Sequence, residues 1–268
     1  MIVALIDNGS LEAAAHRNLR RVADALAGLT GTRVHAVSWK HSDRIAPAEL
    51  DGTPAWTLGA FVRAMHALGQ REFLFVPFFI SAQGAIGSAL RSDLEKLRAE
   101  LGELDFDFSP GLASGDALAT IVSARIREVK AARALVCPPV VLVDHGGPSP
   151  ASAALRNQLA AIVRSQLGGE TGPVTAASME GQHPPLLADQ LNVPGFAEHD
   201  VIVALLFLSP GRHAGPGGDI VQICAASGTR CHLTELVGTH PLAVETLATA
   251  LREKVRSLQP VTLAPAGS

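Results

Sequence analysis

The chain has 268 residues, 47 % of them hydrophobic and 18 % charged, and a formal net charge of −3. This length suits two domains of about 130 residues each. A near-neutral charge without blocks of like charge argues against nucleic-acid binding, and no apolar run approaches the ~20 residues of a membrane span. The N-terminus lacks the basic start of a signal peptide, and the three cysteines lack C-x-x-C spacing. We therefore expect a cytoplasmic protein without a disulfide framework or a thiolate zinc site.

The first half alternates short apolar strands with amphipathic helices. Strands are expected at residues 2–6, 34–37, 73–80 and 105–108, and helices at 11–26, 57–68, 89–101 and 117–130. Residues 42–50 are polar and are expected to be irregular. Alternation of this kind is typical of an α/β fold with a parallel sheet.

The same pattern restarts after Pro138-Pro139. Strands are expected at residues 140–143, 174–176 and 201–208, helices at 151–167, 220–226 and 241–258, a crossover at 184–191 and an extended segment at 231–235. The run at 201–208 is unbroken and apolar, which is typical of a strand buried on both faces of a parallel sheet.

The two halves can be laid on each other. Residues 6–10 match residues 143–147, and residues 73–81 match residues 201–209 strand for strand. We therefore predict a duplication with domains at 1–136 and 137–268. Under this alignment Asn8 and Ala85 of the first half stand where the second half has His145 and His213.

His145 and His213 each follow a buried strand, and glycines come after both. In a doubly wound sheet, the loops after neighbouring central strands meet at the carboxyl edge, where ligands bind. Imidazole is a common ligand of divalent metals and titrates near neutral pH, so a pair can hold a metal ion and also accept protons. A single histidine in a loop is more often structural. The matched placement after two equivalent strands is what distinguishes these two.

At these residues the chain resembles the sirohydrochlorin chelatases of the class II chelatase superfamily. The resemblance rests on Asp144-His145-Gly146-Gly147 and on residues 205–213, with degenerate copies at residues 7–10 and 76–85. It implies an α/β fold of two flavodoxin-like domains, each a parallel sheet flanked by helices, that face each other across a central cleft. It also implies that His145 and His213 bind the metal and assist its insertion into the tetrapyrrole. Gly147 replaces the family's usual Ser or Ala, and Asp219 lies further from His213 than the family's acidic residue, which puts a ligand role for Asp219 in doubt.

Further candidate residues follow strand ends. Glu180, after the strand at 174–176, is a third possible metal ligand or proton acceptor, although a solvated loop carboxylate is an equally good interpretation. Because the substrate carries many carboxylates, we expect Arg212 to bind it. The remaining candidates for substrate binding are Asn8, Ser10, Gly146 and Gly211.

The resemblance implies a lyase-type chelatase whose partner is sirohydrochlorin, with no organic cofactor and with Fe²⁺ or Co²⁺ as substrate. The absence of a histidine-rich tract favours Fe²⁺ slightly, giving sirohaem; Co²⁺ would lead towards cobalamin. Nucleic-acid and membrane partners are not expected, and a monomer is compatible with a duplication that supplies both halves of the cleft.

Two alternatives stay open. One is a non-catalytic carrier of a tetrapyrrole or metal on the same fold. The other is a hydrolase or transferase with Ser10 or Ser209 as nucleophile, which is less favoured because the chain has no G-x-S-x-G elbow.

Overall fold

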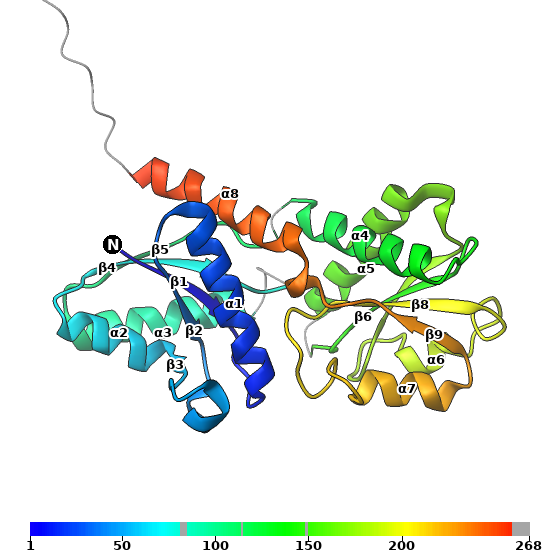
Figure 1. The fold of residues 1–268 in the computed structure, drawn as a ribbon, viewed down its shortest axis with the longest axis horizontal. Coiled ribbons are helices and arrows are strands. Elements are labelled where there is room, and N and C mark those ends of the chain that lie inside the picture. The colour runs from blue at the N-terminus through cyan, green and yellow to red at the C-terminus, as the bar shows by residue number, and fades with distance from the viewer. Residues whose placement is uncertain (81–84, 114, 148–149, 259–268) are drawn as a thin grey trace, which may run out of the picture.

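The computed structural model describes residues 1–80, 85–113, 115–147 and 150–258, with the side chains of 85–87 left out. Two α/β units lie side by side, each built on its own sheet (Figure 1). Strands of the first unit are β1 (Ile2–Asp7), β2 (Val34–Ser38), β3 (Trp56–Thr57), β4 (Glu72–Pro77) and β5 (Asp105–Phe108). Strands of the second unit are β6 (Val140–Asp144), β7 (Val174–Ser178), β8 (Asp200–Leu205) and β9 (Arg230–Leu233). Within each sheet, all the paired strands run parallel.

The helices occupy nearly all the predicted positions. They are α1 (Ala13–Thr30), α2 (Leu58–Ala67), α3 (Ala85–Leu101), α4 (Ala117–Ala132), α5 (Pro150–Leu167), α6 (Leu187–Leu191), α7 (Asp219–Ser227) and α8 (Pro241–Leu258). The segment at 42–50, expected to be irregular, contains two short 3₁₀ turns, and β3 was not foreseen. A two-residue edge strand is too short to give a periodic signal.

Apart from the edge strand β3, which only the first sheet has, the two sheets share one strand order, and they confirm the predicted fold class of parallel sheets flanked by helices. The first has the order β3-β2-β1-β4-β5 and the second the order β7-β6-β8-β9. Their registers also correspond, because Asp7 pairs with Ser38 where β1 meets β2, and Asp144 pairs with Ser178 where β6 meets β7. The duplication read from the sequence is thus present at the level of single residue pairs, while the central cleft remains a prediction.

Two strand ends differ from the sequence expectation. β4 ends at Pro77 rather than at residue 80, and β8 ends at Leu205 rather than at residue 208. Phe78 and Leu206 each donate one more backbone hydrogen bond to the central strand and are buried, although they lie beyond the ladder. The residues just after each strand are buried and therefore apolar, so the apolar pattern in the sequence is longer than the strand itself.

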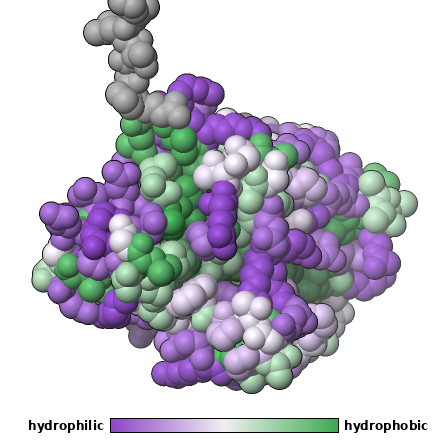
Figure 2. All heavy atoms as spheres, turned by 60° about the vertical axis from the view of Figure 1, so that its left-hand side comes forward, coloured by the Kyte–Doolittle hydropathy of each residue, from purple (hydrophilic) through white to green (hydrophobic). Residues whose placement is uncertain are grey.

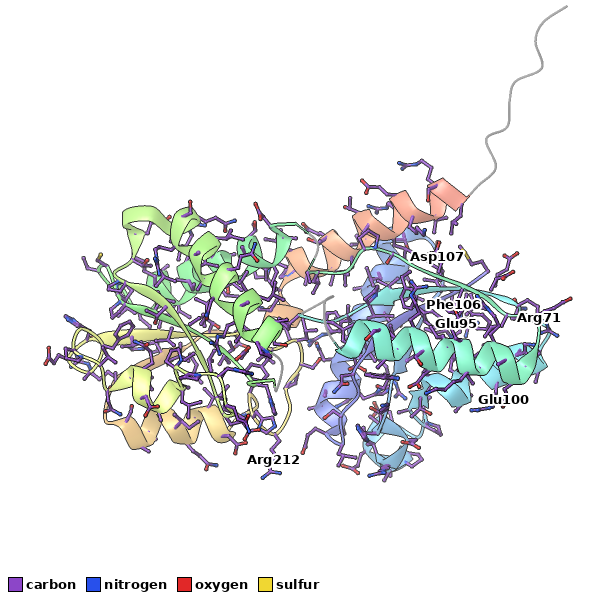
Figure 3. The ribbon with its side chains drawn as sticks, turned by 180° about the vertical axis from the view of Figure 1, so that it is seen from behind. Arg71, Glu95, Glu100, Phe106, Asp107 and Arg212 are labelled. Carbon is purple, nitrogen blue, oxygen red and sulfur yellow. The ribbon has the colours of Figure 1, made fainter. Side chains whose placement is uncertain are left out.

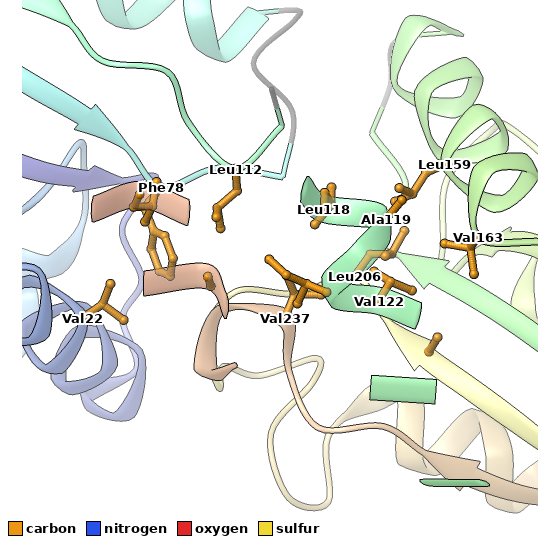
Figure 4. Close-up of a cluster of buried hydrophobic side chains, with 14 of the residues drawn as sticks. Val22, Phe78, Leu112, Leu118, Ala119, Val122, Leu159, Val163, Leu206 and Val237 are labelled. Atoms are coloured by element: carbon orange, nitrogen blue, oxygen red, sulfur yellow. The ribbon is translucent and has the colours of Figure 1, made fainter. Parts of the chain in front are cut away.

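The last helix of each half packs against the other half. α4 lies against α5 and β8 of the second sheet, and α8 lies against α1 of the first (Figure 1). One hydrophobic cluster runs through both units as a result: it joins Val22 and Phe78 to Leu118, Val163 and Leu206 (Figure 4). The sequence boundary at 136/137 remains a prediction. In space, each unit includes a helix from the other half.

The surface is of mixed character. Hydrophilic and hydrophobic residues alternate over the face shown in Figure 2, where hydrophobic residues gather near the end of α8. No helix within the described part of the chain is long and apolar enough to cross a membrane.

Candidate functional site

The two candidate histidines lie together. β6 and β8 are neighbours in the second sheet and run parallel, so the loops that follow them leave the same edge. His145 is the first residue after β6, and His213 lies in the loop after β8. Their ring centroids are 4.7 Å apart, with the rings at 80° in an edge-to-face arrangement. The structure therefore brings two imidazoles that are distant in sequence to one point on the carboxyl edge.

Glu180 joins this pair from the loop after β7. Its Oε1 atom lies 3.5 Å from Nε2 of His145, and the two side chains are 59 % and 52 % exposed. The backbone N–H of Glu180 also donates to the carbonyl of His145 at 3.3 Å. This carboxylate is thus a neighbour of the histidine pair and accessible from solvent, as a metal ligand or proton acceptor would have to be.

Gly146 makes the close approach of these two loops possible. Its φ is +93°, and a Cβ atom at this position would lie 1.8 Å from the carbonyl oxygen of Glu180. A side chain here would push apart the loops that hold His145 and Glu180. This gives Gly146 a clear structural role, whereas its role in substrate binding remains a prediction.

Asp219 is the carboxylate partner of His213. It is the first residue of α7, and its Oδ2 atom lies 2.5 Å from Nδ1 of His213. A proton on Nδ1 is held by this contact, which leaves Nε2 of His213 free to accept a proton or bind a metal. The sequence spacing had put a ligand role in doubt, and the geometry indicates that Asp219 orients the imidazole instead.

The glycine-rich segment between His213 and Asp219 is a tight return. The N–H of Ile220 donates to the carbonyl of His213 at 3.2 Å, and Gly215 donates to Gly211 at 2.8 Å. A Cβ atom on Gly218 would lie 2.7 Å from the carbonyl oxygen of His213. The glycine-rich residues between His213 and Asp219 therefore allow the start of α7 to fold back onto His213. The sequence shows the acidic residue directly after Gly217-Gly218, but its contact with His213 depends on how this loop folds.

The remaining predicted residues lie around this centre in different ways. Arg212 is exposed, and its side chain extends away from the loop (Figure 3). Asn8 is exposed on the first half, and the carbonyl of Asn8 accepts from the N–H of Lys40 at 3.2 Å. The hydroxyl of Ser10 accepts from the N–H of Glu12 at 3.0 Å, which shapes the turn before α1. Binding of substrate by Arg212, Asn8, Ser10 or Gly211 stays a prediction.

A buried ion pair supports the site from beneath. The side chain of Arg156, on α5, is 1 % exposed. Its Nη1 atom donates to Oγ of Ser178 and lies 3.5 Å from Oδ1 of Asp144, which also accepts from Oγ of Ser178 at 2.9 Å. Asp144 precedes His145 directly, and Ser178 lies two residues before Glu180. Arg156 therefore fixes the ends of the two strands that present these side chains, a role that the sequence pattern did not predict.

The donors present suit a metal in transit more than a closed metal centre. No group of three or more His, Cys, Asp and Glu side chains able to hold a metal lies among residues 1–80, 85–113, 115–147 and 150–258. Two imidazoles, each next to a carboxylate, leave the other coordination positions of an ion open. Structural sites are usually closed by four protein ligands, whereas a site that passes its ion on needs open positions.

Comparison with known proteins finds a family match for the half that carries this site. Residues 139–254 match the family model of CbiX. This part of the chain is therefore similar to the CbiX family. All four side chains of the cluster, His145, Glu180, His213 and Asp219, lie within the matched residues. A search of curated protein sequences gave no match.

Solved structures show that the fold of the whole chain, CbiX half and first half together, is that of two-domain chelatases. The chain is similar to CbiX, described as the terminal enzyme for biosynthesis of sirohaem in denitrifying bacteria, with a TM-score of 0.67, 18 % identity and coverage of 94 % of this chain and 99 % of that one. It is also similar to SirB from Bacillus subtilis with Fe³⁺, with a TM-score of 0.67, 13 % identity and coverage of 94 % and 95 %. A third match is the sirohydrochlorin chelatase SirB from Bacillus subtilis subspecies spizizenii in complex with cobalt, with a TM-score of 0.67, 12 % identity and coverage of 96 % and 97 %. The family model and these structures support the resemblance to sirohydrochlorin chelatases seen in the sequence.

Proposed function

We propose that this protein is a sirohydrochlorin chelatase that inserts a divalent metal ion into the tetrapyrrole. The observation that carries the proposal is the pair of imidazoles at the carboxyl edge of the second sheet, each with a carboxylate beside it. The CbiX match of this half, and the likeness of the whole chain to chelatase structures, support the same assignment.

The reaction consumes a metal ion and a metal-free ring and releases two protons. His145 and His213 offer imidazole nitrogens to the incoming ion as it loses water. The ring nitrogens then replace these ligands as two pyrrole N–H protons leave. Glu180 and whichever imidazole is not bound to the ion are the bases that accept those protons. Asp219 contacts the Nδ1 atom of His213, so the Nε2 atom on the other side of the ring is available to the ion.

We propose Fe²⁺ as the preferred metal, giving sirohaem, with Co²⁺ as the alternative. Imidazole nitrogens bind both ions, so ligand chemistry does not decide between them. SirB structures are described with Fe³⁺ and with cobalt, which supports binding of either metal on this fold. Sirohydrochlorin is the proposed partner. A monomer in the cytoplasm remains our expectation because one chain supplies both units.

An anaerobic insertion assay tests this function. Purified protein at low concentration is mixed with excess sirohydrochlorin and with Fe²⁺ or Co²⁺, and the change in the absorption spectrum of the ring is followed. We expect many turnovers per chain, with a higher kcat/KM for Fe²⁺. Binding in a one-to-one ratio, with no acceleration over the uncatalysed rate, would instead identify a tetrapyrrole or metal carrier.

The nucleophile alternative gains no support from the geometry. The hydroxyl of Ser209 accepts from Nδ2 of Asn18 at 2.9 Å, and that of Ser10 accepts from the backbone of Glu12. Both hydroxyls thus serve loop structure. A serine nucleophile would need a general base within hydrogen-bonding distance instead.

A further inference from the structure

The loop that carries His213 has contacts with the first half of the chain. After β8 the backbone bonds to its own half twice: Leu206 donates to Val143 at 2.9 Å, and Phe207 accepts from Val237 at 3.0 Å. The next two residues bond to Asn18 of α1 instead. Its Nδ2 atom donates to the carbonyl of Leu208 at 3.1 Å and to Oγ of Ser209 at 2.9 Å.

The amide of Asn18 is buried and its orientation is fixed. The residue is 3 % exposed, and its Oδ1 atom accepts from Nη2 of Arg21. A guanidinium can only donate, so the amide oxygen must face Arg21 and the amide N–H₂ group must face the loop. Asn18 therefore offers donors to the carbonyl of Leu208 in one arrangement only.

The carbonyl of Leu208 is also blocked on another side. Residues Val237–Thr239 form a 3₁₀ turn, η4, directly before α8. A Cβ atom on Gly238 of this turn would lie 2.1 Å from the carbonyl oxygen of Leu208. The backbone at Leu208 is thus held between η4 and α1, five residues before His213.

We propose that Asn18 is a positioning residue for His213, so that the first half orders the loop of a site whose chemistry lies in the second half. The inference rests on the proposed function and deepens it. The first half then contributes to insertion through the geometry of the loop rather than through a group that touches the metal or ring. Because a displacement of about 1 Å in a catalytic group costs on the order of 100-fold in rate, loss of this anchor should lower kcat.

Asn18→Asp is the sharpest test. The carboxylate keeps the size of the side chain and the acceptor for Arg21, but it cannot donate to the carbonyl of Leu208. Placing a carboxylate oxygen against that carbonyl should displace the loop. Asn18→Ala is the second variant, because it removes the donor without adding a charge. Arg252→Ala is the matched control: Arg252 donates to the carbonyl of Leu29 and so joins α8 to α1 far along the helix from Asn18.

Two measurements are made on each variant. In the insertion assay we expect kcat to fall at least tenfold for Asn18→Asp and Asn18→Ala, with KM for sirohydrochlorin within about twofold and with kcat of Arg252→Ala within about twofold of wild type. In ¹⁵N-histidine NMR spectra, with His213 assigned by comparison with His213→Ala, we expect the His213 signals to shift or broaden in both Asn18 variants and to be unchanged in Arg252→Ala.

The NMR result decides the inference independently of the function. Unchanged His213 signals in both Asn18 variants would overturn it, as would a loss of kcat equal to that of Arg252→Ala. If the wild-type protein inserts no metal, the proposed function fails, whereas the NMR comparison still tests whether Asn18 orders the His213 loop.

Discussion

The ends of the two central strands are held together in different ways in the two halves. In the second half, Asp144 and Ser178 contact buried Arg156. In the first half, Asp7 and Ser38 occupy the equivalent positions, and Nδ1 of His16 lies 3.3 Å from Oγ of Ser38. A helix after the first strand supplies the partner in both cases, but only the second half has a permanent cation there.

Burial shifts the pKa values of two groups in the first-half cluster. Burial raises the pKa of Asp7 to about 6, against hydrogen bonds from Ser38 and the backbone of Gly9. Burial, followed by the nearby charge of Arg20, lowers the pKa of His16 to about 4. Burial therefore shifts both groups towards their neutral forms, although Asp7 is still mostly ionised at pH 7. The half that presents His145 and Glu180 is built around an ion pair, which is consistent with a greater need for fixed strand ends where the chemistry takes place.

The largest expected effect concerns the histidines that only the second half has. His145→Ala and His213→Ala should each lower kcat for insertion by about 100-fold or more, because each removes a donor to the metal and a proton acceptor. His199→Ala, an exposed histidine of the same half, is the control and should stay within about twofold of wild type. Circular dichroism should show that all three variants are folded. Near-full activity in both site variants would show that His145 and His213 do not perform the insertion.

Loss of the partner of His213 should have a smaller effect on rate. Asp219→Asn keeps the shape of the side chain but removes the negative charge next to Nδ1. A hydrogen bond to a charged group contributes about 1.5–3 kcal/mol, so we expect kcat to fall by roughly 10- to 100-fold with little change in KM. A rate equal to that of the wild type would show that the orientation of His213 does not depend on Asp219.

The same substitution should have opposite effects on stability in the two halves. Asp144→Asn leaves Arg156 buried without its carboxylate and should lower the free energy of unfolding by about 3 kcal/mol at pH 7. Asp7→Asn should raise it at pH 7 by about 1–2 kcal/mol, since the wild-type carboxyl is ionised there despite its burial. Urea unfolding of both variants measures the two changes. Destabilisation by Asp7→Asn at pH 7 would contradict the contrast between the halves.

The pH dependence of Asp7 sharpens this contrast. Its folded pKa of about 6 lies above its ordinary value of 3.8, so the folded protein binds the proton more tightly than the unfolded chain. The stability that Asp7 contributes is complete below pH 3.8 and is lost as the pH rises through 6. The advantage of Asp7→Asn over wild type should therefore shrink towards zero between pH 7 and pH 4. Unfolding curves at three pH values check this, and a constant difference would show that Asp7 does not titrate in this range.

The sequence predicted those features that follow from local pattern and from duplication. Periodicity located the strands, and parallel neighbours bring their following loops to one edge, which is why His145 and His213 could be paired. The sequence did not predict that α4 and α8 each pack against the opposite half. An amphipathic pattern indicates that a helix has a buried face but not which sheet covers it. The roles of Asp219 and Asn18 were not predicted, for a related reason. Their roles depend on how a loop folds back or on contacts across 190 residues, and spacing along the chain does not encode either.

The central claim is that His145 and His213 form one site that performs the insertion. The most direct test is the steady-state rate of anaerobic Fe²⁺ insertion by the double variant His145→Ala/His213→Ala, compared with the wild type and the uncatalysed reaction. We predict a rate close to the uncatalysed one, in a chain that is folded and has the thermal stability of the wild type. A double variant that still turns over at the rate of the wild type would contradict the account.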